Sequence, residues 1–79
     1  MNVKDFNKLQ KKLEKAEKEY KQALETKDEE LIKETYDNWH RIIQKNEGPG
    51  TGFFYDEDTN QFKIASDWHV DESGEIVRN

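Results

Sequence analysis

Residues 47–52 read Glu-Gly-Pro-Gly-Thr-Gly and separate two parts of the 79-residue chain in which apolar residues recur with different periods. Glycine and proline interrupt helices and strands, so this stretch predicts a linker. Before it the apolar spacing is helical, and after it short runs alternate as in strands. The predicted fold is therefore α+β in a single domain, residues 1–79. An antiparallel helical hairpin (1–46) is expected to pack on a small antiparallel β-meander of three or four strands (53–79).

Two amphipathic patterns precede the linker. Between residues 3 and 24 apolar side chains recur every three or four positions, close to coiled-coil spacing, with no glycine or proline inside. A second helical stripe covers residues 31–43. Between the two, Thr26 with Glu29 predicts a capping box, and Asp28 is the competing cap. A connection this short requires the two helices to lie antiparallel.

The part after the linker predicts β-hairpins. Runs at 52–55 and 61–65 are rich in aromatic and aliphatic residues and flank an acidic, turn-forming segment. Shorter runs at 68–70 and 75–77 flank Asp71-Glu72-Ser73-Gly74, which is a second hairpin signal. A sheet of this size needs a helix packed on it, and the helical hairpin is expected to supply that cover.

The composition predicts a small core. Only 32% of residues are apolar and 39% are charged, so little surface is available to offset the entropy of the chain. We expect Trp39 and Trp68, one from each part, to be largely buried and to join the two parts. A marginal core favours self-association, so the sequence predicts a homodimer through the helices. The expected contact is the coiled-coil-like seam formed by Leu9, Leu13, Ala16 and Tyr20.

The charge is distributed unevenly and points to a partner. Residues 1–46 carry eleven basic and ten acidic residues, whereas residues 47–79 carry two basic and eight acidic ones. One interpretation is that the acidic turns provide solubility and protect sheet edges. The other is an acidic, aromatic surface complementary to a larger basic protein, for instance one that binds nucleic acid. The predicted partner-binding residues are Tyr55, Asp56, Glu57, Asp58, Asp67, Trp68, His69, Asp71 and Glu72.

Two other classes of function remain open. The first is a small-ligand or metal-binding protein that uses the linker (48–52) with His40 and His69. Asp37 and Asp67 lie near these histidines in the sequence, but nothing in it brings the two pairs together, so no metal or cofactor is predicted. The second is a purely structural dimerisation module.

A lysine stripe on the first predicted helix raises the question of nucleic-acid binding. Its members recur every three or four positions, as phosphate contacts along a groove require: Lys4, Lys8, Lys11, Lys15 and Lys18. Glutamates are interspersed among them, and arginine, the better reader of bases, occurs only twice in the chain. Direct nucleic-acid binding is therefore not predicted.

Catalysis is not predicted either. The chain has no cysteine, and its serines have no evident neighbouring base to activate them. It has no long apolar run, so we expect a cytoplasmic protein without a membrane segment. The excess of lysine over arginine, together with six asparagines, is typical of AT-rich genomes, including those of many phages and mobile elements. The sequence thus predicts a small, non-catalytic adaptor or inhibitor.

Overall fold

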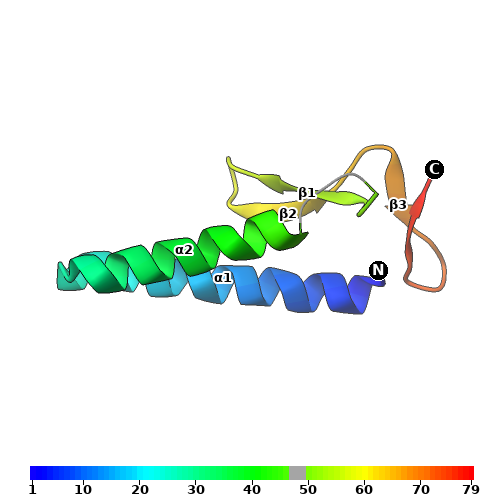
Figure 1. Ribbon diagram of the computed structural model, residues 1–79. Helices are drawn as coiled ribbons and strands as arrows, with labels where there is room; N and C mark the ends of the chain where they lie inside the picture. The colour runs from blue at the N-terminus through cyan, green and yellow to red at the C-terminus, as the bar shows by residue number, and fades with distance from the viewer. Residues whose placement is uncertain (47–49) are drawn as a thin grey trace.

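The computed structural model describes residues 1–46 and 50–79, which form two helices and four strands (Figure 1). The elements are α1 (Val3–Thr26), α2 (Glu29–Asn46), β1 (Phe53–Asp56), β2 (Gln61–Ile64), β3 (Trp68–Val70) and β4 (Ile76–Arg78). The predicted α+β class, with a helical hairpin followed by antiparallel strands, is confirmed. Residues 47–49 of the predicted linker lie outside the described residues.

The turn between the helices is built by Asp28. Its side-chain oxygen accepts hydrogen bonds from the backbone N–H groups of Glu30 (3.2 Å) and Leu31 (3.4 Å), which makes Asp28 the N-cap of α2. The predicted capping box headed by Thr26 is wrong, because the Thr26 hydroxyl donates back to the carbonyl oxygen of Ala23 (2.6 Å). Lys27 ends α1 in the left-handed conformation, with φ 60°.

The two helices pack through small and aliphatic side chains. Leu13, Ala16 and Ala23 of α1 are buried, as are Ile42 and Ile43 of α2. Leu13 and Ala16 belong to the seam that the sequence analysis assigned to a homodimer, and they are 0% and 3% exposed within a single chain. The seam therefore belongs to the core of the chain itself. A dimer through the helices stays a prediction and needs another face.

The strands form two separate two-stranded sheets. β1 pairs with β2 from Phe53↔Ile64 to Asp56↔Gln61, and β3 pairs with β4 from Trp68↔Arg78 to Val70↔Ile76. They do not join into one meander, because the chain turns between β2 and β3, where the N–H of Trp68 donates to the carbonyl oxygen of Ala65 (3.0 Å).

The second sheet pairs with the start of the chain. The N–H of Val3 donates to the carbonyl oxygen of Gly74 (2.6 Å), and the N–H of Ile76 donates to that of Met1 (3.0 Å). Asn2 and Glu75 form an isolated antiparallel bridge between these two bonds. The start of α1 is thereby fixed to the β3–β4 hairpin.

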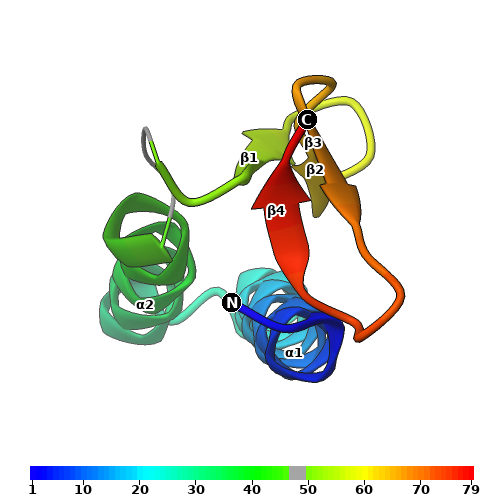
Figure 2. The same cartoon turned by 90° about the vertical axis from the view of Figure 1, so that its right-hand side faces the viewer.

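Both sheets lie on one side of the helical hairpin, and the view along the helices leaves its other side bare (Figure 2). Phe53 and Phe62 point into the core, where Phe53 meets Phe6 of α1 with ring centroids 5.5 Å apart. Trp39 and Trp68 both pack against this core, but each is only half-buried, which is less burial than expected.

Candidate functional site

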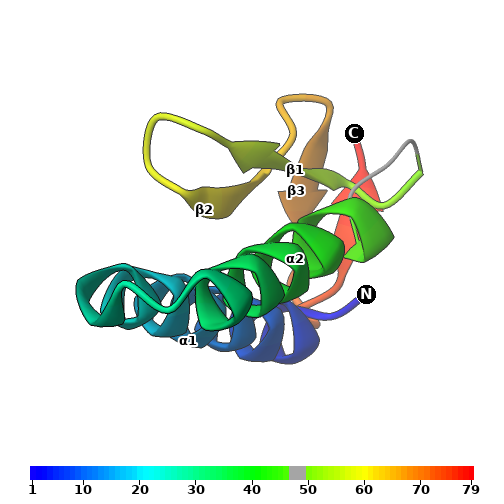
Figure 3. The ribbon, with the colours of Figure 1, turned by 60° about the vertical axis from the view of Figure 1, so that its left-hand side comes forward.

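The acidic residues predicted to bind a partner divide into two groups at opposite ends of the β layer (Figure 3). The β1–β2 turn reaches α1 at Glu17, whose carboxylate accepts a hydrogen bond from Asn60 (3.4 Å). The β3–β4 turn reaches α1 at Val3 through Gly74. Positions 3 and 17 are separated by about 21 Å along a helix that rises 1.5 Å per residue. The nine predicted residues therefore fall into two separate groups, and their common role in binding stays a prediction.

At the Val3 end the predicted residues serve the fold. The carboxylate of Asp71 accepts hydrogen bonds from Ser73 Oγ (2.7 Å), the N–H of Glu75 (2.9 Å) and the N–H of Ser73 (3.0 Å). These bonds hold the pKa of Asp71 below its ordinary value, and the bond from the Ser73 hydroxyl has the largest effect. Trp68 packs against the core.

The other residues at this end are exposed but scattered. His69 is on β3, and its ring nitrogen Nδ1 pairs with Oδ1 of Asn79. Asp67 precedes β3, and Glu72 lies in the β3–β4 turn, so the two exposed carboxylates stand at opposite ends of that strand.

At the Glu17 end we define the acidic turn as Asp56, Glu57 and Asp58. Asp56 is committed to the turn, because it pairs with Lys63 Nζ (2.6 Å) and accepts a hydrogen bond from the N–H of Asp58 (2.9 Å). These two contacts lower the pKa of Asp56, and the bond from Lys63 has the larger effect. The side chains of Glu57 and Asp58 are exposed.

An aromatic cluster lies on the helical hairpin, and we define it as Tyr20, Tyr36, Trp39 and His40. Tyr20 of α1 stacks on Trp39 of α2, with ring centroids 5.5 Å apart. The ring centroids of Tyr36 and His40 are 4.1 Å apart. Positions 36, 39 and 40 share one face of a helix, which explains the cluster on α2. Tyr36 is 44% exposed, so the cluster presents an aromatic face to solvent.

A chain of hydrogen bonds ties the β1–β2 turn to α1. The hydroxyl of Tyr55 donates to Asn60 Oδ1 (2.8 Å), Asn60 Nδ2 donates to Glu17, and Glu17 pairs with Lys21 (3.0 Å). Because Glu17 precedes Tyr20 by three residues, the two side chains are neighbours on α1. The contact between Asn60 and α1 is thus one helical turn from Tyr20 of the cluster.

Burial raises the pKa of Tyr55, and the charges of Glu17, Glu57 and Asp56 raise it further. Within the described residues, Trp39 Nε1 is a buried donor without a hydrogen-bond acceptor. An aromatic face and an unpaired donor therefore occur within one region of the hairpin, where Arg41 lines a hollow together with Tyr36 and His40.

The histidines considered for a metal site have different partners. His40 belongs to the aromatic cluster, whereas His69 pairs with Asn79. Across residues 1–46 and 50–79, no group of three or more histidine, aspartate or glutamate side chains is arranged to hold a metal ion. Neither described helix has the length and apolar character needed to cross a membrane.

Sequence reasoning missed two residues that position this site. Gln10 of α1 binds the backbone of Phe62 in β2, and Tyr36 provides the most exposed ring of the aromatic cluster. The spacing of Tyr36, Trp39 and His40 was visible in the sequence, but it is also the spacing of an ordinary helix core. No protein-family model matches the chain, and no curated protein or solved structure matches it either.

Proposed function

We propose that the protein is a non-catalytic interaction module, an adaptor or an inhibitor, that binds a basic segment of a larger protein. The binding surface is the aromatic cluster together with the acidic turn. The observation that supports it is the contact of Asn60 with Glu17, which ties the turn that carries the exposed carboxylates of Glu57 and Asp58 to α1, one helical turn from Tyr20 of the cluster.

The chemistry of the surface favours arginine and lysine side chains. Guanidinium and ammonium groups are attracted to the faces of tyrosine and tryptophan rings, and the contact strengthens as water is excluded. Glu57 and Asp58 add long-range attraction, which raises the association rate with a positively charged partner. We assign the β3–β4 turn no part in binding, because the carboxylate of Asp71 is bonded within the turn itself. A cytoplasmic location and a phage or mobile-element origin belong to the same proposal and rest on composition alone.

Affinity for a defined probe tests the proposal. The probe is a short peptide of alternating arginine and glycine, and a glutamate–glycine peptide of equal length serves as the negative control. We expect Tyr36→Ala to weaken binding of the basic peptide by about tenfold, equivalent to about 1.4 kcal/mol. The matched control is Phe54→Ala, because Phe54 is 42% exposed on the outward face of β1 and Tyr36 is 44% exposed on α2.

Charge reversal provides a second, independent comparison. Glu57→Lys in the acidic turn should slow association and reduce its dependence on salt, whereas Glu72→Lys in the β3–β4 turn should have a much smaller effect. Both residues are exposed glutamates in turns. Equal losses for both variants would mean that only net charge matters. Equal binding of the two peptides would contradict the proposal.

A further inference from the structure

The backbone edges of the two sheets differ in what pairs with them. The outer edge of β2 binds the side chain of Gln10, and the outer edge of β4 binds the backbone of Met1. Each sheet has two strands, so the remaining edges belong to β1 and β3. An unpaired strand edge presents backbone N–H and C=O groups that can pair with another extended chain.

We define the free edge as the side of β1 that faces away from β2. Phe62 directs both of its backbone groups to Gln10, so its partner in the ladder, Tyr55, directs its own N–H and C=O to the free edge. Phe53 points the same way, but the Thr51 hydroxyl donates to its C=O (3.0 Å) and accepts from its N–H (3.4 Å). Across the described part of the chain, no hydroxyl or amide caps the backbone of Tyr55 in this way. Tyr55 is therefore the open position of the free edge.

The free edge lies on the side of α2 and continues into the acidic turn. Figure 2 shows β1 on the α2 side of its sheet and β2 nearer to α1. Tyr36, Trp39 and His40 of the aromatic cluster belong to α2. β1 ends at Asp56, and the exposed carboxylates of Glu57 and Asp58 follow directly. A strand added to the free edge therefore lies on the α2 side of the sheet and extends to the acidic turn.

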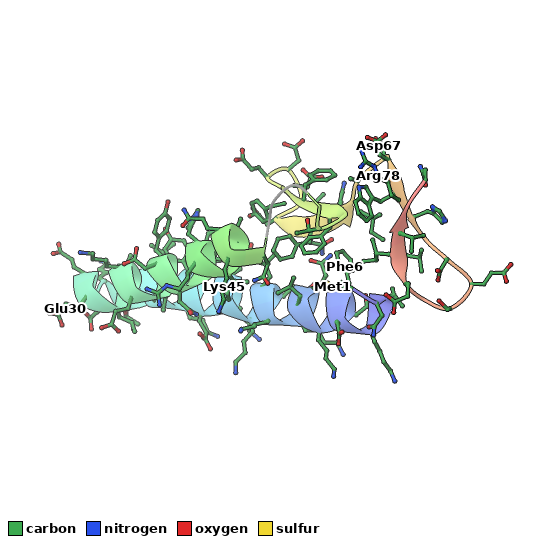
Figure 4. All side chains as sticks on the ribbon, turned by 45° about the vertical axis from the view of Figure 1, so that its right-hand side comes forward. Met1, Phe6, Glu30, Lys45, Asp67 and Arg78 are labelled. Carbon is green, nitrogen blue, oxygen red and sulfur yellow. The ribbon has the colours of Figure 1, made fainter. Side chains whose placement is uncertain are left out.

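The edge of β3 has a comparable open position in different surroundings. The N–H of Ile76 donates to Met1, away from β3, so its ladder partner Val70 also directs its backbone groups to an outer edge. Figure 4 shows Asp67 and Arg78, which carry opposite charges, on this hairpin at the other end of the molecule from Glu30. Val70 is therefore an internal control for an open strand edge that has no run of acidic residues like the acidic turn.

We infer that the basic segment of the partner binds in an extended conformation, as a third strand that pairs with the free edge of β1. The inference rests on the proposed function and adds the conformation of the bound segment. The backbone of the segment exchanges two hydrogen bonds with Tyr55, as opposite residues of an antiparallel ladder do. Its basic side chains are attracted to Glu57 and Asp58, where the added strand reaches the acidic turn. Main-chain bonds supply affinity in this mode of recognition, and side chains supply specificity.

Methylation of the backbone of a probe peptide tests the inference. The probe is a short peptide of alternating arginine and threonine, because threonine favours extended chains. The same peptide with every backbone nitrogen methylated keeps its charge but has no backbone donor. We expect methylation to weaken binding by at least about tenfold, measured by calorimetry. Equal affinities would overturn the inference and leave the proposed function in place, whereas failure of both peptides to bind would contradict both.

Hydrogen exchange of the protein amides shows where the peptide pairs. In the free protein the amides of Tyr55 and Val70 should exchange rapidly, whereas the amide of Phe62 should exchange slowly because it donates to Gln10 (2.8 Å). Saturating arginine–threonine peptide should slow the Tyr55 amide by at least about tenfold and leave the Val70 amide unchanged.

Three results of the exchange measurement would overturn the inference. The first is slower exchange at Val70 without any change at Tyr55, and the second is no change at either amide while the peptide is bound. The third is protection of Tyr55 that rises with protein concentration in the absence of peptide, because a second copy of the chain would then occupy the free edge.

Discussion

The side-chain amide of Gln10 on α1 forms two hydrogen bonds with the backbone of Phe62 on β2. Gln10 Nε2 donates to the carbonyl oxygen of Phe62 (2.6 Å), and the N–H of Phe62 donates to Gln10 Oε1 (2.8 Å). Because the N–H and C=O of one residue in an antiparallel strand point to the same side, both groups lie on the edge that β1 does not pair. A helix side chain thus takes the place of a third strand.

This contact positions the candidate site. Gln10 and Glu17 lie seven residues apart, two turns along one face of α1. Gln10 fixes the middle of β2, and Glu17 accepts a hydrogen bond from Asn60 in the turn of the same hairpin. Together they set how far the acidic turn extends along the helices. They also protect an exposed strand edge from pairing with another chain.

Gln10→Ala should lower the free energy of unfolding by about 1–3 kcal/mol, because it leaves the N–H and C=O of a 2% exposed residue without partners. Denaturant unfolding measures the change, and hydrogen exchange of the Phe62 amide should become faster. The control is Gln44→Ala on α2, an exposed glutamine, which should change stability by a few tenths of a kcal/mol at most. Equal stabilities of the two variants would contradict the bridging role of Gln10.

Gly52→Ala should be strongly destabilising. Gly52 has φ +86°, and a Cβ there would approach Trp68 Cε3 to 2.7 Å and Ile76 Cγ2 to 2.8 Å. Backbone strain and overpacking together should cost roughly 2–5 kcal/mol. Gly50→Ala separates the two causes, because Gly50 has φ +88° with nothing within 4 Å of the added atom. It should cost only the strain, about 1–2 kcal/mol, by the same unfolding measurement. Equal losses of stability for Gly52→Ala and Gly50→Ala would show that the close approach of Trp68 does not matter.

Asp71→Ala should destabilise the β3–β4 turn in a pH-dependent way. The folded-state pKa of Asp71 is lowered from its ordinary value of 3.8, so its stabilising contribution is present above that value. The contribution is lost as the pH falls through the lowered pKa. The stability difference between Asp71→Ala and the parent should therefore be largest near neutral pH and should shrink below about pH 4. Glu72→Ala, in the same turn, is the control, and a gap that does not change with pH would contradict the assignment.

The helices and the turns were predictable because their signals are local. Apolar residues at spacings of three and four define α1 and α2 over many turns, and the Asp-rich and Gly-containing segments define the two β-hairpins. The separation of the sheets was not predictable, because it depends on contacts between distant residues. The backbones of Met1 and Val3 form hydrogen bonds with those of Ile76 and Gly74. No periodic pattern in the sequence predicts such a pairing.

The candidate site was only partly predictable for the same reason. Composition identified the acidic residues, but it could not show that the β1–β2 turn meets Glu17 while the β3–β4 turn meets Val3. Gln10 looks like any polar residue of an amphipathic helix. Asp71 was assigned to a binding surface because it belongs to a cluster of acidic residues in turns, and the sequence could not show that its carboxylate accepts three hydrogen bonds within the turn.

Chemical-shift mapping with the arginine–glycine peptide tests the proposed binding surface most directly. The account predicts that the indole N–H of Trp39 and the backbone amides of Tyr36, Glu57 and Asp58 shift on titration, that the shifts weaken as salt rises, and that the indole N–H of Trp68 stays unchanged. The glutamate–glycine peptide should produce no such shifts. Shifts confined to Trp68 and the β3–β4 turn, or no shift at Trp39 and the acidic turn at millimolar peptide, would contradict the claim.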